Sequence, residues 1–210
     1  MTASMVLNTA LALPSLAAEE PSVYQDATQK FSITIPSGWS AEKSSISGAE
    51  GGYSGYTGER PTVILLPSDP QARDCNISIV GTNISFEFTK LGSFGNVYAF
   101  ASNLVGSQDR SNLLRFRSLD SATDEDPIQI AKLIDASDRG GEVYEVEYTV
   151  QKFPSPLKRH LFVSTTIGFD GKYNQLFTVT GQCREEDVEK YRSVLLNTVR
   201  TFKSGLRPVF

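Results

Sequence analysis

Several kinds of residue are scarce in this chain, and each shortage excludes a class of function. Its 210 residues include one histidine, His160, and two cysteines, Cys75 and Cys183. A zinc centre of the usual kind is hard to assemble from one imidazole and two cysteines without metal-site spacing. The histidine also has no obvious nucleophile at a fixed offset, so no hydrolase-type constellation can be placed. We therefore expect that the protein is not an enzyme.

Basic charge is also in short supply. The formal net charge is −4 and the pI is about 5.1. Binding to nucleic acid requires a clustered basic surface for the phosphates, so we expect no nucleic-acid partner. After residue 20 the sequence lacks an apolar run long enough to span a bilayer. The length suits one hydrophobic core, and we expect one domain that is soluble or peripherally attached to a membrane.

The N-terminal segment differs from the rest of the chain. Residues 5–18 are apolar and end in Ser15-Leu16-Ala17, the small-x-small pattern of a signal-peptidase site, and no basic residue precedes Lys30. We interpret residues 1–18 as a residual targeting signal, residues 19–29 as an N-terminal arm and residues 30–204 as the folded domain. A short buried helix is the alternative for residues 5–18.

The C-terminal half carries the clearest structural pattern. Apolar and polar residues alternate over 143–150 and 159–169, and Asp170-Gly171 indicates a tight turn into a third strand, 173–180. These strands predict an antiparallel meander. Residues 185–203 then predict an amphipathic helix with an acidic first turn, and its apolar side would pack on the sheet.

The N-terminal half contains shorter elements. We expect strands at 31–35, 62–66 and 76–82, with a Gly/Ser/Tyr-rich hairpin connection over 44–59. Ser93 predicts the N-cap of a helix that runs to residue 104, and a second short helix is expected at 128–134. Together the elements indicate an α+β fold, with helices on both faces of a mostly antiparallel sheet.

The order and spacing of short segments resemble the PsbP domain family over about residues 24–203. The segments that carry the resemblance are Tyr24-Gln25-Asp26, Lys30-Phe31-Ser32-Ile33, Ile35-Pro36-Ser37-Gly38-Trp39, Asn76-Ile77-Ser78-Ile79, Leu91-Gly92-Ser93, Asp135-Ala136-Ser137, residues 144–148, Arg159-His160 and Asp170-Gly171-Lys172. The resemblance implies an αβα sandwich of the PsbP/Mog1-like kind, with a central, mostly antiparallel sheet of about six strands flanked by helices.

The resemblance also implies a role. Proteins of this family are extrinsic to photosystem II in the chloroplast thylakoid lumen, where they support the oxygen-evolving complex and its retention of calcium and chloride, whereas divergent relatives act as assembly or stability factors. It implies a monomer that is peripheral to the thylakoid membrane and binds lumenal subunits of photosystem II. The resemblance implies no cofactor bound by the protein itself, and any association with calcium would be through photosystem II. A small lumenal enzyme or ligand-binding module is the remaining alternative.

The same resemblance suggests one metal ligand. His160 matches a family histidine that is linked to divalent metal binding together with an aspartate after the following strand. The matching position here is Gln182, followed by Cys183. The carboxylate is therefore missing, although a cysteine would be a softer ligand that favours zinc. A hydrogen-bonded histidine without a metal is the alternative.

Three further predictions concern the surface and the thiols. Lys152, Lys158, Arg159 and Lys172 lie at the ends of neighbouring predicted strands, where their side chains can converge into a basic docking patch. Cys75 and Cys183 flank predicted strands and are candidates for a disulfide, or for two free buried thiols. Asp120 and residues 124–126 form an acidic loop that lacks the pattern of an EF-hand, so we interpret it as a solvated turn.

Overall fold

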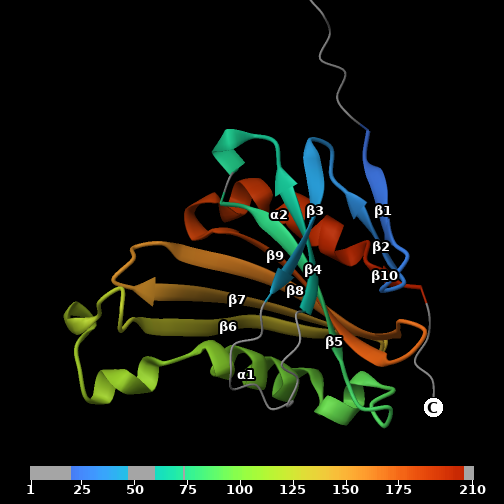
Figure 1. The fold of residues 1–210 in the computed structure, drawn as a ribbon. Helices are drawn as coiled ribbons and strands as arrows, with labels where there is room; N and C mark the ends of the chain where they lie inside the picture. The colour runs from blue at the N-terminus through green and yellow to red at the C-terminus, as the bar shows by residue number, and fades with distance from the viewer. Residues whose placement is uncertain (1–19, 47–59, 73, 206–210) are drawn as a thin grey trace, which may run out of the picture.

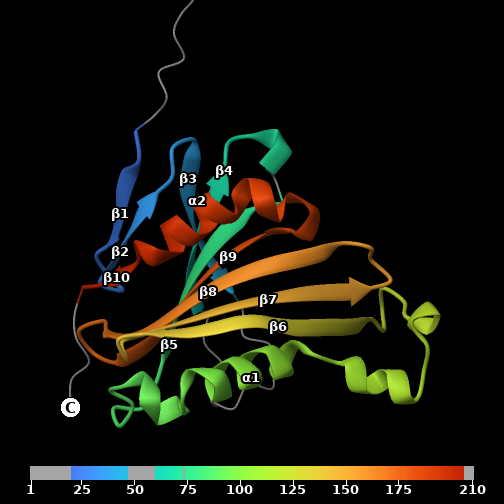
Figure 2. The ribbon, with the colours of Figure 1, turned by 180° about the vertical axis from the view of Figure 1, so that it is seen from behind.

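The computed structural model describes residues 20–46, 60–72 and 74–205. Within these ranges, ten strands form two antiparallel sheets, and one α-helix covers each face of the larger sheet (Figures 1 and 2). The larger sheet has seven strands in the order β3-β4-β5-β9-β8-β7-β6, and the smaller has the order β1-β2-β10. The expected sandwich around a central antiparallel sheet is confirmed, with one strand more than the six expected.

In chain order the elements are β1 Ser22–Asp26, β2 Phe31–Ile35, β3 Trp39–Ile46, β4 Arg60–Pro67, η1 Pro70–Ala72, β5 Asn76–Asn83, η2 Leu91–Phe94, α1 Val97–Gln108, η3 Ser111–Arg115, η4 Leu119–Ser121, β6 Ile128–Arg139, β7 Val143–Phe153, β8 Lys158–Phe169, β9 Asn174–Arg184, η5 Glu185–Asp187, α2 Val188–Arg200 and β10 Lys203–Ser204. The expected strands at 31–35, 62–66 and 76–82 correspond to β2, β4 and β5. The hairpin connection expected over 44–59 lies mostly outside the described residues, as does the targeting segment 1–18.

The predicted meander is confirmed as β7, β8 and β9. Each pairs antiparallel with the next, and the Asp170 carboxylate accepts hydrogen bonds from the N–H groups of Lys172 and Tyr173, at 2.7 and 2.6 Å, to close the β8–β9 turn. Residues 160–165 of β8 are all buried, because α1 packs on one face of the sheet and α2 on the other. The meander therefore forms the centre of the sandwich.

The helix expected at 128–134 is wrong, since these residues begin β6, an edge strand that pairs with β7. Apolar residues at 128, 131 and 134 imitate a helical period in the sequence. In the structure the register shifts between Leu133 and Asp135, which leaves Ile134 on a β-bulge with half of its surface exposed. The bulge moves the strand's pattern by one residue, and the simple alternation of a strand is lost.

Helix α1 lies under β6 and β7 (Figure 1). Its N-cap is Asn96, whose side-chain oxygen accepts a hydrogen bond of 2.9 Å from the N–H of Ala99, rather than the expected Ser93, which lies in η2. None of its twelve residues is charged. The helix is held by apolar contacts of Val97, Ala101 and Val105 with the face of β7 that carries Tyr144 and Val146.

Helix α2 crosses the opposite face, over β8 and β9 (Figure 2). Its buried residues Tyr191, Leu195 and Val199 follow the predicted apolar side. A Cβ atom on Gly181 of β9 would lie 3.2 Å from Val199 Cγ2 and 3.3 Å from Leu195 Cβ. The absence of a side chain at this position allows the helix to pack closely on the strand.

The small sheet closes one end of the α2 face. Ser22–Asp26, within the expected N-terminal arm, forms β1 and pairs with β2, which in turn pairs with β10 at Lys203–Ser204. Phe31, Phe177 and Phe202 pack together where this sheet meets the main one, with ring centroids 5.4 to 5.8 Å apart. The described part of the arm is thus joined to the fold by a strand pair.

Candidate functional site

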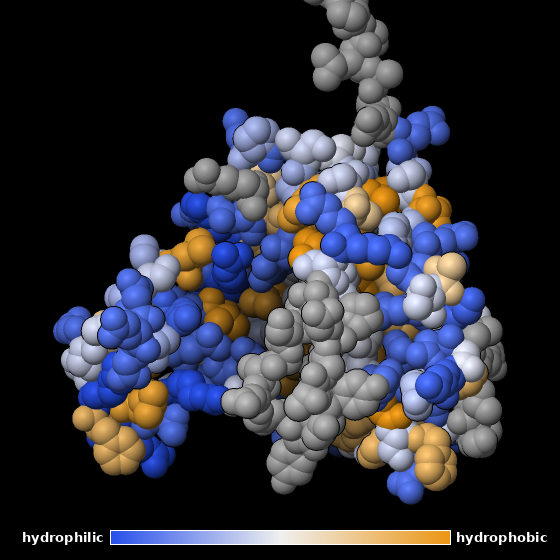
Figure 3. All heavy atoms as spheres, viewed as in Figure 1, coloured by the Kyte–Doolittle hydropathy of each residue, from blue (hydrophilic) through white to orange (hydrophobic). Residues whose placement is uncertain are grey.

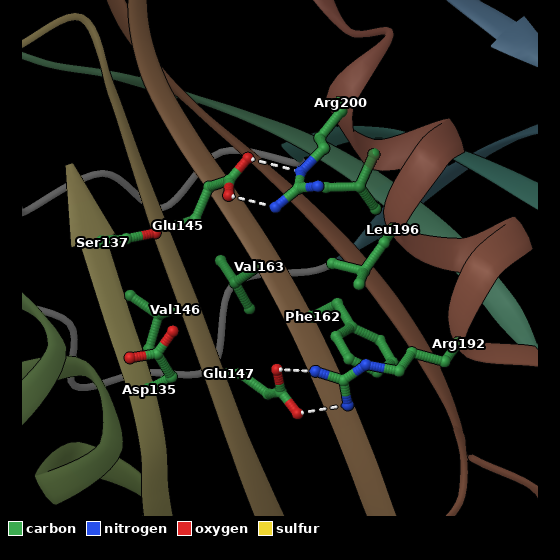
Figure 4. A pocket seen from close by; sticks show the side chains of 11 residues that line it. Asp135, Ser137, Glu145, Val146, Glu147, Phe162, Val163, Arg192, Leu196 and Arg200 are labelled. Atoms are coloured by element: carbon green, nitrogen blue, oxygen red, sulfur yellow. Dashed lines mark hydrogen bonds and ion pairs between the residues drawn. The ribbon is translucent and has the colours of Figure 1, made fainter. Parts of the chain in front are cut away.

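A pocket of about 120 Å³ opens between helix α2 and the outer strands β6 and β7 (Figure 4). It forms because α2 covers β8 and β9 and leaves the neighbouring part of the same face open to solvent. Charged residues surround a small apolar floor. The lining residues are Asp135, Ser137, Glu145, Val146, Glu147, Phe162, Val163, Arg192, Leu196, Val199 and Arg200.

Two arginines of α2 bind two glutamates of β7 across this pocket (Figure 4). Arg192 donates two hydrogen bonds, of 2.8 and 2.7 Å, to the carboxylate of Glu147. Arg200 donates two, of 3.0 and 2.8 Å, to Glu145, which also pairs with Arg139 at 3.0 Å. Two-point pairing fixes the orientation of both groups, so the helix is tied to β7 by directional contacts as well as by apolar packing.

His160 extends this network toward the start of α2. Its Nε2 lies 2.7 Å from Glu147 Oε1 and its Nδ1 lies 2.8 Å from Glu185 Oε2, and the residue is 4% exposed. Ionised carboxylates accept hydrogen bonds and never donate them, so both contacts are hydrogen bonds only when both ring nitrogens carry protons. Glu185 also pairs with Lys158 at 3.3 Å. We call the set Glu145, Glu147, Lys158, His160, Glu185, Arg192 and Arg200 the charged belt.

The belt favours the ionised forms of its carboxylates. Burial alone would raise the pKa of Glu147, but the hydrogen bonds from Arg192 and His160 outweigh burial and hold that pKa below its usual value. Burial opposes ionisation of Glu185 in the same way, and the contacts with His160 and Lys158 again leave its pKa lowered. The cations and carboxylates thus stabilise one another.

The belt gives His160 partners other than a metal. Its two ring nitrogens point in opposite directions, so Glu147 and Glu185 flank the ring and do not converge on one point. His160 pairs with Cys183 in the β8–β9 register, and Gln182 lies on the other face of β9. In the described ranges no group of three or more His, Cys, Asp or Glu side chains is arranged to hold a metal ion. A metal at His160 stays a prediction, and an ion would have to displace one of the carboxylates.

The four basic residues expected to form one docking patch do not come together. Lys158 and Arg159 begin β8, whereas Lys172 follows its other end, and a strand of 12 residues spans about 40 Å. Lys158 points toward α2 and pairs with Glu185, so its neighbour Arg159 points to the opposite face. The prediction that these side chains converge is wrong, because strand direction and alternation both separate them.

The remaining candidates have simpler positions. Asp120, Asp124, Glu125 and Asp126 are exposed, and Asp126 pairs with Arg117, which agrees with a solvated turn. Cys75 and Cys183 are buried free thiols on adjacent segments of the sheet. The belt glutamates were missed by the sequence interpretation. Their signal was present, because charged residues alternate with apolar ones on a strand whose two faces are both covered.

Fold and site together define a class of protein: a small α+β domain with a sheet between two helices, and a charged pocket that contains two arginine–glutamate pairs. No helix in the described part of the chain is both long and apolar enough to cross a membrane.

Comparison with known proteins narrows this class to a family. The family model described as PsbP matches residues 19–204, and the chain belongs to the PsbP family. Proteins of this family are structural or assembly factors and are not enzymes. PsbP domain-containing protein 3, chloroplastic, from Arabidopsis thaliana is 34% identical over 188 residues, which cover 89% of this chain and 66% of that protein. The chain thus spans slightly less than two thirds of that relative's length.

A solved structure of a PsbP protein shows the same fold. The solution structure of CyanoP, the cyanobacterial PsbP of Synechocystis sp. PCC 6803, aligns with a TM-score of 0.56 and 18% identity, covering 92% of this chain and 97% of that one. The Ran-binding protein Mog1p of Saccharomyces cerevisiae aligns with a TM-score of 0.45 and 9% identity, covering 89% and 96%. The likeness to CyanoP concerns the fold alone.

Proposed function

We propose that this chain is a lumenal protein of the chloroplast thylakoid that binds photosystem II and supports its oxygen-evolving complex, including the retention of calcium and chloride. The observation that carries the proposal is the PsbP family match, which extends from residue 19 to residue 204 and so includes every described strand and helix. The chloroplastic designation of the Arabidopsis relative supports the organelle. We propose that the protein acts by binding, because the charged groups of the belt are paired with one another.

Exposed residues at one end of the sandwich support the proposal of a contact surface there. Lys152 is exposed near the end of β7. Arg159 lies on the neighbouring strand β8, where it pairs with Val150, two residues before Lys152. The η3 turn is fixed to the same end, because the N–H of Arg110 donates a 2.7 Å hydrogen bond to the carbonyl of Gln129, which pairs with Lys152. In both ribbon views the short helical turns that follow α1 lie at the end of the sandwich where β7 ends (Figures 1 and 2).

This end also presents apolar side chains. Leu114 is 39% exposed and Phe116 is 86% exposed, and apolar residues gather there at the lower left of Figure 3. The adjoining Arg117 is hydrogen-bonded to Ser121 and Asp126, so the turn that presents Phe116 is held in place. A pre-ordered exposed aromatic is a favourable anchor at an interface. We name Lys152, Arg159, Leu114 and Phe116 the β7-end surface and propose it as the side that meets photosystem II.

Rebinding to salt-washed photosystem II membranes tests this proposal. The wild-type chain is expected to bind, to be released by high salt without detergent, and to rebind when the salt is lowered. Phe116→Ala and the double variant Lys152→Glu/Arg159→Glu should each weaken rebinding by roughly tenfold. Phe86→Ala and Lys172→Glu are matched controls, because Phe86 is 72% exposed and Lys172 lies at the other end of β8. Failure of the wild-type chain to bind contradicts the function, and equal binding of all variants contradicts only the surface.

A role as an assembly or stability factor is the second candidate. Four acidic residues lie on the same loop system as Phe116, namely Asp120, Asp124, Glu125 and Asp126. The β7-end surface is therefore mixed in charge, and each ion pair there would contribute little. Weak, reversible binding is expected of a factor that binds assembly intermediates transiently. The abundance of the chain relative to mature photosystem II distinguishes the two roles.

A further inference from the structure

The two cysteines lie opposite each other in the sheet. Cys183 is in β9, and Cys75 immediately precedes β5, the neighbouring strand. The β5–β9 register pairs Asn76 with Gln182 and Ile77 with Gly181, so its continuation by one residue places Cys75 across from Cys183. The two residues beyond this pair, Asp74 and Arg184, are also joined, because they form an ion pair. The cysteines are therefore flanked on both sides by contacts that fix the register.

The kind of strand pair suits a disulfide. The N–H of Cys75 donates a 2.7 Å hydrogen bond to the carbonyl of Ala72 and is not shared with β9. Cys75 and Cys183 thus face each other as a pair without a backbone hydrogen bond from Cys75. Such non-hydrogen-bonded pairs have Cα atoms about 4.5 Å apart, and disulfides join Cα atoms about 4.4 to 6.8 Å apart. The backbone can accept the bond with little movement.

Each thiol changes the ionisation of the other, because hydrogen bonding to the partner thiol lowers the pKa of Cys75 and raises the pKa of Cys183. Cys75 is consequently the thiol that ionises first, and a thiolate is the form that attacks disulfides. Both residues are at most 1% exposed beneath helix α2, so an external disulfide reaches them only after local opening of the structure.

We propose that Cys75 and Cys183 form a reversible intramolecular disulfide that locks the start of β5 to the junction of β9 and η5. The Cys75 thiolate attacks a small disulfide such as oxidised glutathione, whose S–S bond breaks and releases one thiolate. Cys183 then loses its proton and attacks the mixed disulfide at the Cys75 sulfur, which releases the second thiolate. The donor gains two electrons and two protons, and the cysteine pair loses them.

The bond would stabilise the layer that carries the charged belt. It links residues more than a hundred positions apart and closes a loop that contains α1 and the whole meander. Cys183 is separated from Glu185 by one residue and is opposite His160, so the bond anchors the chain beside the first belt contact of α2. Cross-links that close long loops constrain the unfolded chain most.

The test uses the purified full chain equilibrated with oxidised or reduced glutathione. Oxidation is expected to lower the intact mass by two hydrogens, to block alkylation of both thiols after denaturation, and to leave a monomer. It should also raise Tm by roughly 5–15 °C, and reduction should reverse all of these changes. Cys75→Ala and Cys183→Ala keep the site apolar and should have a Tm that is independent of the redox buffer.

Two results would overturn the proposal. One is two alkylatable thiols in the oxidised wild-type chain, and the other is a Tm that does not change while the mass shows the bond. The readouts do not involve photosystem II, so the outcome is independent of the proposed function.

Discussion

The two faces of β7 are covered by helices that are attached in different ways. On one face Tyr144, Val146 and Tyr148 pack against α1, which has no charged residue. On the other face Glu145 and Glu147 bind two arginines of α2. Helix α1 is therefore held by burial of apolar surface and by hydrogen bonds, including one from the N–H of Ala131 to the carboxylate of its C-cap Asp109. Helix α2 is held by burial together with ion pairs. The stability of the α2 layer should therefore depend on salt, and should depend on pH more strongly than that of the α1 layer.

The largest effects should be common to both layers, because both rest on apolar cores. Leu195→Ala in the α2 layer and Leu91→Ala in the α1 layer each remove a side chain that is at most 1% exposed. Each should lower the free energy of unfolding by about 2–5 kcal/mol, measured by chemical denaturation. Leu133→Ala, at a 39% exposed position, is the control. A small loss from either buried change would mean that its layer is not held by burial.

Removal of one belt charge should have an intermediate effect that is confined to the α2 layer. Glu147→Gln leaves His160 and Arg192 without their shared carboxylate and should lower the free energy of unfolding by about 1–3 kcal/mol. Tyr144→Phe is the counterpart in the α1 layer, since it removes only the 2.9 Å hydrogen bond from the Tyr144 hydroxyl to the Gly95 carbonyl. We expect about 0.5–1.5 kcal/mol for that change. Equal losses would weaken the contrast between the layers.

Acid should destabilise the α2 layer more than the α1 layer, where the carboxylate of Asp109 is also bonded to the sheet. The pKa values of Glu147 and Glu185 are lowered in the folded protein. The stabilisation from these groups is therefore present above the unfolded pKa of about 4.3 and is lost as the pH falls through their folded values. Denaturation midpoints measured between neutral pH and about pH 3 should fall less for Glu147→Gln than for the wild-type chain. Tyr144→Phe should follow the wild-type profile, and parallel curves for all three proteins would contradict the role of the belt.

The smallest effect should come from the exposed end of the belt. Lys158 pairs with Glu185, and both side chains are more than a third exposed. Lys158→Gln should cost about 0–1 kcal/mol, and the difference from wild type should vanish in high salt. A larger, salt-resistant loss would show that this pair is shielded from solvent.

The central meander and helix α2 could be predicted from the sequence, because their periods of two and 3.6 residues are uninterrupted. Strand β6 could not, since apolar residues three apart and a bulge at Ile134 obscured its alternation. The cap of α1 fell at Asn96 rather than at Ser93, and both residue types favour that position. Local sequence patterns predicted the right element where one pattern was present. They failed where two patterns competed, as in β6 and at the cap of α1.

The site was harder to predict than the fold, because it depends on which strand ends and faces meet. Lys158 and Lys172 both lie at ends of predicted strands, but these are opposite ends of β8. The partners of His160 come from β7 and η5 and are 13 and 25 residues away. Cys75 and Cys183 flank β5 and β9, which pair directly, and their pairing in a disulfide stays a prediction.

Quantitative mass spectrometry of photosystem II purified at low salt tests the central claim most directly. The proposed function predicts that the chain is present in amounts equimolar with the reaction-centre subunits, with a mature N-terminus near Ala18 or Glu19. A much lower amount, concentrated in assembly intermediates, would favour the second role. Absence of the chain from both mature and intermediate complexes would contradict its association with photosystem II.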